Sequence, residues 1–141
     1  MDADGLQRFV KAQKVNYEKA LSEITEGRKR SHWIWYIFPQ FKDFAHSRMA
    51  EFYGIEDKNE AEVYLRHPVL GKRLREITTA LLQHKGKDIN IIFGELDAGK
   101  VRSCMTMFDY ISPNDVFGQV LDAFYGGKRG GRTLKKMHSE G

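Results

Sequence analysis

The stretch LQRFVKAQKVNYEKALSEITEG, residues 6–27, begins the chain with the pattern of one long amphipathic helix. Its apolar positions recur at steps of three and four residues, which places them on one face of an α-helix. That face consists of Leu6, Phe9, Val10, Gln13, Tyr17, Ala20, Leu21 and Ile24. Gly27 follows at the position where a glycine commonly ends a helix. We therefore predict a helix over roughly residues 4–26.

Capping residues mark further helix starts along the chain. Ser47, Asp57 and Asp115 each stand at a predicted N-cap position. Asp57 is followed three residues later by Glu60, which is the spacing of a capping box. Pro68 fits the first turn of another helix. Proline has no backbone N–H, and the N–H groups of a first turn have no partner within the helix. Apolar residues at helical spacing from Lys100 to Ile111 predict another helix, and Thr133 can cap a last turn. Together with the first helix, these signals predict about six or seven helices.

The predicted fold is an all-α, compact single-domain bundle with a long N-terminal helix. Residues 33–38 fit a short helical turn or an extended piece, and residues 89–93 fit a strand or a short buried helix. A chain of 141 residues, 41% apolar and 30% charged, is typical of one domain, here residues 1–141. About residues 127–141 are rich in glycine, lysine and arginine, and we predict a flexible basic segment there.

Composition excludes several classes of protein and site. The single cysteine, Cys104, rules out an internal disulfide, and no apolar run approaches the length of a membrane span. These features predict a cytoplasmic protein without a membrane partner. The five histidines lack the spacing of a zinc site, so we predict no metal and no cofactor. Cys104 falls on the apolar face of a predicted helix, where a thiol usually serves as a small hydrophobic side chain.

The stretch GELDAGKV, residues 94–101, resembles a phosphate loop only in part. Gly94, Gly99 and Lys100 match the pattern G-x-x-x-x-G-K. The next residue should be serine or threonine, whose hydroxyl binds magnesium, but it is Val101. Two acidic residues inside the loop would also face the phosphates. We therefore predict a turn between two helices here.

The stretch GRKRSHWIWYIFPQF, residues 27–41, joins three cations directly to a histidine and both tryptophans of the chain. A structural interpretation is open, since cations suit a helix C-terminus and aromatic residues suit a core. Guanidinium groups beside indole rings also suit a planar anionic ligand such as a nucleotide. Lys100, Ser103 and Thr106 form a second polar set at three-residue steps. If the two sets face each other, they form a basic pocket with an aromatic wall.

Ten residues are therefore candidates for ligand binding, and one of them is also a candidate catalytic residue. The ten are Arg28, Arg30, Ser31, His32, Trp33, Trp35, Gln40, Lys100, Ser103 and Thr106. Because the preceding cations disfavour another positive charge, we expect His32 to be neutral at pH 7 and able to act as a base. We also expect it within reach of Ser103 or Thr106. The competing interpretation is a local hydrogen bond from His32 to a helix end.

Several motifs are similar to those of one known family. They are LQRFV-KAQ, Y--AL-EI--GRKRSHWIWYIFPQ, EFYGI, A--YL-HPVLG-RL, IFG followed by K-RSCMTMF, and FYGG-----TL. From Leu6 to about Leu134 the chain resembles the family called domain of unknown function 1810. Its members are small, single-domain, all-α proteins, mostly bacterial. The resemblance implies the helical fold, and no activity, cofactor or catalytic residue. Some members carry the label calpastatin, which nothing in this sequence supports.

Three hypotheses about function follow from these patterns. The first is a small cytoplasmic protein that binds an anionic, nucleotide-like ligand, with or without acting on it as an enzyme. The second is a protein-interaction or regulatory module without chemistry, in which the aromatic stretch is only core. The third is nucleic-acid binding through the basic C-terminal segment, which predicts a steep dependence on salt.

The family commonly has a serine in place of Cys104, which argues further against a cysteine nucleophile.

Overall fold

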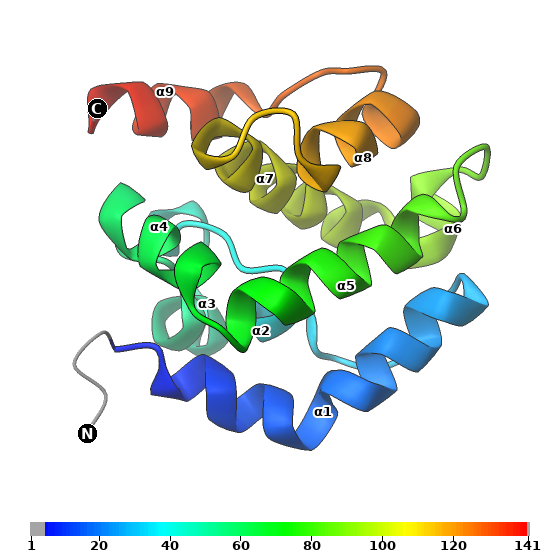
Figure 1. Ribbon diagram of the computed structural model, residues 1–141, viewed down its shortest axis with the longest axis horizontal. Helices are drawn as coiled ribbons and strands as arrows, with labels where there is room; N and C mark the ends of the chain where they lie inside the picture. Colours follow the sequence, from blue (N-terminus) through cyan, green and yellow to red (C-terminus); the bar gives the residue numbers. More distant parts are fainter. Residues whose placement is uncertain (1–4, 141) are drawn as a thin grey trace.

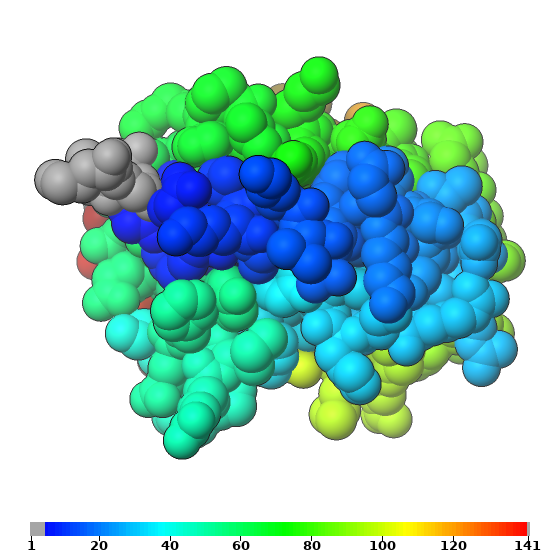
Figure 2. Space-filling model, turned by 90° about the horizontal axis from the view of Figure 1, so that it is seen from below, coloured from blue at the N-terminus to red at the C-terminus, as the bar shows by residue number. Residues whose placement is uncertain are grey.

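Helix α1 (Gln7–Glu26) runs along one side of the molecule and crosses the whole face shown in Figure 2. The computed structural model describes residues 5–140, so residue 4 of the predicted first helix lies outside the described part. Helix α5 (Leu70–Leu82) packs between α1 and α8 (Val116–Tyr125), and α7 (Glu95–Ile111) lies beyond it (Figure 1). Within the described residues, 71% are helical and no strand is present, which confirms the all-α prediction.

Nine α-helices form in the described part of the chain, against the six or seven predicted. The remaining elements are α2 (Ile34–Ile37), the 3₁₀-helix η1 (Lys42–Phe44), α3 (Arg48–Tyr53), α4 (Lys58–Arg66), α6 (Ile89–Phe93) and α9 (Gly131–Ser139). The additional helices include α6, where the sequence allowed a strand, and α9, whose helix begins right after a glycine-rich loop.

The predicted caps are present. The side chains of Ser47, Asp57 and Asp115 accept hydrogen bonds from backbone N–H groups at the starts of α3, α4 and α8. Gly27 ends α1 in the left-handed conformation, at φ 85°. Helix α7 begins at Glu95, earlier than the predicted start near Lys100, so the expected turn is reduced to Gly94. Acidic side chains in a first turn stabilise the positive end of a helix, which explains the earlier start.

A row of aromatic rings crosses the core from α1 to α8. The rings of Phe9 and Tyr64 have centroids 5.1 Å apart, those of Tyr64 and Phe108 lie 5.5 Å apart, and those of Phe108 and Phe117 lie 5.7 Å apart. All four side chains are fully buried. Because each ring belongs to a different helix, this row joins α1, α4, α7 and α8 through side-chain packing.

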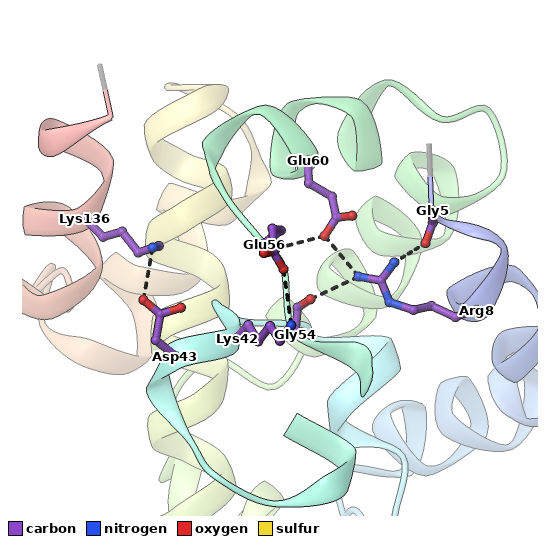
Figure 3. Close-up of polar contacts among 8 residues, drawn as sticks. All are labelled: Gly5, Arg8, Lys42, Asp43, Gly54, Glu56, Glu60 and Lys136. Carbon is purple, nitrogen blue, oxygen red and sulfur yellow. Dashed lines mark hydrogen bonds and ion pairs between the residues drawn. The ribbon is translucent and has the colours of Figure 1, made fainter. Parts of the chain in front are cut away.

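A polar cluster ties the start of α1 to the segment between α3 and α4 (Figure 3). One terminal nitrogen of Arg8 donates to the Gly54 carbonyl and contacts the Glu60 carboxylate, both at 3.0 Å. Beside it, the backbone of Lys42 donates to Ile55 at 2.9 Å in an isolated parallel bridge. A Cβ on Gly54 would lie 2.3 Å from the Cα of Lys42. The close approach of the two segments therefore requires glycine.

The basic C-terminal segment forms helix α9 and packs on α7. Thr133 and Met137 are buried. Lys136 pairs with the Asp43 carboxylate at 3.1 Å (Figure 3), and Arg132 donates to the Asp43 carbonyl. Residues 131–139 of this segment are thus helical and contact η1 in the structure. Residue 141 lies outside the described residues, and the predicted flexibility of the segment stays a prediction.

Two glycines in helices should respond in opposite ways to alanine. A Cβ on Gly71 would lie 2.1 Å from the Leu65 carbonyl oxygen, so Gly71→Ala must push α4 and α5 apart. We expect it to lower the free energy of unfolding by at least about 2 kcal/mol. Gly99 is exposed in α7 with no atom within 4 Å of its Cβ position, so Gly99→Ala should raise stability by up to about 1 kcal/mol. Chemical denaturation of both variants tests this, and equal effects would contradict the packing described.

Candidate functional site

The turn after α1 is a Schellman motif built on Gly27. The N–H of Gly27 donates to the Ile24 carbonyl at 2.9 Å, and the N–H of Arg28 donates to the Glu23 carbonyl at 3.0 Å. This pairing needs a left-handed residue at Gly27, which glycine adopts without strain. The turn sends residues 28–33 back along the end of α1.

The carboxylate of Glu23 organises the residues after this turn. Its oxygens accept hydrogen bonds from the backbone N–H groups of Arg30, at 2.7 Å, and Ser31, at 3.0 Å. They also accept from the Ser31 hydroxyl at 2.7 Å and from the indole N–H of Trp33 at 2.9 Å. Glu23 is only 6% exposed, and Trp33 is 1% exposed. A single buried carboxylate therefore holds the whole segment in place.

These hydrogen bonds also decide the charge of Glu23. Burial by itself raises the pKa of this carboxyl, but the donors from Arg30, Ser31 and Trp33 outweigh it and lower the pKa to about 2. Glu23 is therefore ionised at neutral pH although it is buried. The negative charge is satisfied by four donors, which is the condition for burying a carboxylate at acceptable cost.

A hollow of about 350 Å³ lies beside this segment, between α1 and the residues that follow it, and we call it the α1 hollow. Figure 2 shows the face on which α1, in blue, borders the lighter-blue segment. The hollow is lined by Asn16, Lys19, Arg30, Ser31, His32, Trp33 and Tyr36.

Positive charge predominates in the α1 hollow. Lys19 and His32 are exposed, and no ion pair involves either of them among the described residues. The Arg30 guanidinium pairs with Glu26 on the same turn, with both side chains more than half exposed. The ring of Tyr36, which lines the hollow, is held in place because its hydroxyl accepts a hydrogen bond from the Asn16 amide at 2.8 Å. The hollow thus combines basic groups at its rim with aromatic walls.

A second carboxylate, Asp97, connects residues 27–41, which we call the aromatic segment, to the first turn of α7. It pairs with Lys29 at 2.9 Å and with Lys100 at 3.0 Å. The Lys29 ammonium lies 5.3 Å from the ring centroid of Trp33, and that of Lys100 lies 4.3 Å from Trp35. Burial raises the pKa of Asp97, but hydrogen bonds from both lysines outweigh it and hold the pKa below its usual value. Two cation–π contacts therefore share one counter-ion.

A model of the family described as protein of unknown function (DUF1810) matches residues 3–137. The chain belongs to the DUF1810 family. The fold is also similar to the crystal structure of the conserved hypothetical protein Rv1873 from Mycobacterium tuberculosis, with a TM-score of 0.92 and 41% identity. That similarity covers 95% of this chain and 96% of the other. No curated protein matches the sequence.

In this DUF1810 protein, the candidate residues separate into several groups. Arg30, Ser31, His32 and Trp33 line the α1 hollow. Trp35 and Gln40 instead border a shallow depression next to α3 that has no room for a water molecule, and Lys100 lies over Trp35. Arg28 is exposed and Ser103 is half-buried on α7. The proposed proximity of His32 to Ser103 stays a prediction.

Thr106 is the candidate with the clearest structural role. It is fully buried, its hydroxyl donates to the Arg102 carbonyl at 2.7 Å, and it accepts from the Gly130 N–H at 3.0 Å. The first hydrogen bond lies within α7, and the second joins α7 to the start of α9. Its side chain is therefore directed toward α9.

Sequence reasoning missed Glu23 and Asp97, which fix the geometry of the site, as well as Asn16 and Lys19. One signal was available for Glu23, because it follows Ala20 by three residues and so falls on the apolar face of α1. A carboxylate on such a face needs donors from elsewhere in the fold. Asn16 and Lys19 gave no such signal, since polar residues on the outer face of a helix are ordinary.

The described residues give little support for a metal site, a cysteine nucleophile or a functional role of His84. No group of three His, Cys, Asp or Glu side chains there could hold a metal ion. Burial raises the pKa of the Cys104 thiol, which disfavours the thiolate that a nucleophile needs. His84 is a satisfied structural histidine, with its ring nitrogen 2.7 Å from the Ile24 carbonyl oxygen. Nor does this part of the chain contain a helix with the length and apolar character needed to cross a membrane.

Glu23→Gln should destabilise the protein at neutral pH by on the order of 3 kcal/mol, because the Glu23 pKa of about 2 lies well below its ordinary value of 4.5. A depressed pKa stabilises the fold fully above about pH 4.5, and this stabilisation is lost as the pH falls toward 2. The unfolding free energy of the natural protein should decrease over that window, and the variant should lack this component. Urea denaturation at several pH values measures both.

Glu26→Gln is the matched control, since Glu26 lies on the same turn but is exposed, and among the described residues its one ion pair is with Arg30. We expect it to change stability by less than about 0.5 kcal/mol. An equal loss in the two variants would show that the Glu23 hydrogen bonds do not organise the turn.

Proposed function

We propose that the protein binds a small anionic ligand of nucleotide type in the α1 hollow. The observation that carries this proposal is the convergence of Lys19, Arg30 and His32 from two segments onto one hollow walled by Trp33 and Tyr36. Its volume of about 350 Å³ is in the range of sites for small molecules, roughly 300–1,000 Å³. The basic groups around the hollow match the phosphate of such a ligand. Trp33 and Tyr36, which are 1% and 6% exposed, line the hollow with little exposed ring surface.

The basic groups in the hollow have distinct roles in this proposal. Lys19 has no ion pair among the described residues and offers a point charge to a phosphate. Arg30 presents a planar guanidinium, which can exchange its exposed contact with Glu26 for a phosphate at little cost, because exposed ion pairs contribute little. His32 is exposed at the same rim and can hydrogen-bond the ligand through either ring nitrogen.

Rigidity of the lining supports the same proposal. The backbone of Arg30 and Ser31 and the indole of Trp33 are all held by Glu23 before any ligand arrives. Tyr36 is held by Asn16. A preorganised site loses less conformational entropy on binding, so modest contacts suffice for useful affinity.

The other hypotheses have separate support. Exposed Met49 and Phe52 on α3, and exposed Leu96 at the start of α7, favour a protein-interaction role. For nucleic-acid binding through the C-terminal segment the support is weaker. Arg132 and Lys136 are engaged with η1, where their charges lie over the rings of Phe44 and Phe41.

Lys19→Gln and Arg30→Gln should each weaken binding of AMP or ADP-ribose by about tenfold, the effect of losing one charge-assisted hydrogen bond. Binding is measured by isothermal titration calorimetry and by tryptophan fluorescence, because Trp33 lines the hollow. Lys14→Gln is the matched control, since Lys14 is an exposed lysine of α1 outside the hollow. If a broad panel of nucleotides neither binds nor raises the melting temperature, the proposal is wrong.

His32→Ala separates a binding role from a structural one. Because the side chain is exposed, its removal should leave the melting temperature within a few degrees while weakening nucleotide binding by about tenfold. A structural cap would give the opposite pattern, a loss of about 1 kcal/mol in stability with unchanged binding by the folded protein. That second pattern would remove His32 from the proposed site.

A further inference from the structure

The N-terminus of α9 is left open. Its N-cap is Gly130, no side chain caps it, and its first turn contains no acidic residue. Helical bonding starts with the N–H of Leu134, which donates to the Gly130 carbonyl at 3.0 Å. The N–H groups of residues 131–133 therefore have no acceptor among the described residues. Such groups carry the positive end of the helix dipole and form a natural site for an anion.

A buried hydroxyl at the same place also lacks a partner. Thr133 is 1% exposed, and its Oγ1 makes no hydrogen bond in the described structure. The oxygen lies 3.6 Å from the position of a Cβ on Gly130, at the open end of the helix. The neighbouring Thr106 hydroxyl is fully used, since it donates to the Arg102 carbonyl and accepts from Gly130. Thr133 is the member of this pair whose hydrogen-bonding capacity is unused among the described residues.

An arginine from α7 reaches the same point. The Nε of Arg102 lies 3.9 Å from the Cβ position on Gly130, and its guanidinium has no hydrogen-bond or ion-pair partner among the described residues. Lys128, exposed in the loop before α9, is likewise unpaired there. The other arginines of this region are engaged, Arg129 with Asp109 at 3.2 Å and Arg132 with the Asp43 carbonyl. Arg102 and Lys128 thus leave local positive charge beside the open helix end.

We propose that the start of α9 is a second anion site, which binds the phosphate group of a small molecule. The N–H groups of Gly131 and Arg132 donate to the phosphate oxygens, and the unpartnered Thr133 hydroxyl is a further donor. Arg102 supplies the positive charge. Gly131 is exposed and no atom lies within 4 Å of its Cβ position, so a phosphate can approach the backbone closely. This site is separate from the α1 hollow and stands without it.

Isotope-edited NMR on the whole protein tests the proposal, with inorganic phosphate and AMP titrated separately. Saturable shifts of the amide signals of residues 131–133 are expected with both. Tighter binding of AMP would indicate a phosphate that belongs to a larger molecule, and equal affinity would indicate free phosphate. Shifts confined to residues 19 and 30–33, or no saturable shift at all, would overturn the proposal. The same titration reports on the α1 hollow separately.

Two variants that should stay folded show whether a loss of binding comes from the site itself and not from unfolding. Thr133→Val should leave the melting temperature within about 2 °C, because the hydroxyl has no partner to lose, yet it should weaken phosphate binding. Gly131→Asp should stabilise the protein, since a carboxylate in the first turn favours the helix, but it should abolish binding by occupying the anion position. Unchanged binding in both variants would disprove the site.

Arg102→Gln tests the contribution of the positive charge to phosphate binding, and Arg66→Gln is its matched control. Arg102→Gln should weaken phosphate binding by about tenfold, because it removes the charged partner at the helix end. Arg66 is exposed at the end of α4 and does not contact this region, so Arg66→Gln should bind as the natural protein does. Equal affinities for the two variants would show that Arg102 takes no part, contrary to the proposal.

Discussion

The buried carboxylate of Glu23 is the interaction on which the arrangement of the aromatic segment depends. A buried negative charge is tolerated only when donors surround it, and here four donors come from residues 30, 31 and 33. These donors lie only seven to ten residues along the chain, so Gly27 must reverse its direction at once. The carboxylate therefore ties the end of α1 to Trp33, and Trp33 in turn packs against Phe38 and Phe93 in the core.

Asp97 extends the same principle to the other side of the aromatic segment. It is the common partner of Lys29 and Lys100, and each lysine covers one tryptophan ring. The first turn of α7 is thereby tied to the turn after α1, although about seventy residues separate them in the chain. Two carboxylates thus fix the segment that sequence patterns suggested as a binding site.

This arrangement separates basic residues with structural partners from basic residues without them. Lys29, Lys100 and Arg129 are held by carboxylates in the fold and contribute mainly to its geometry. Lys19 and Arg102 lack ion-pair partners in the described part of the chain, and they border the α1 hollow and the start of α9 respectively. The formal net charge of the protein is only +4, so net charge says little about where an anion would bind. Basic side chains without an ion-pair partner indicate the binding surfaces better.

The sequence by itself determined the helical class, most helix boundaries and one side of the α1 hollow. Periodicity, capping residues and Gly27 act locally, and Arg30, Ser31, His32 and Trp33 lie together because they are neighbours in the chain. Tertiary structure decided the rest, because those contacts depend on which faces of separate helices meet. Packing directed Thr106 toward α9 rather than the hollow, and it supplied the donors that allow Glu23 to be buried. Residues 89–93 became α6 because the described fold offers no neighbouring strand to satisfy an extended backbone.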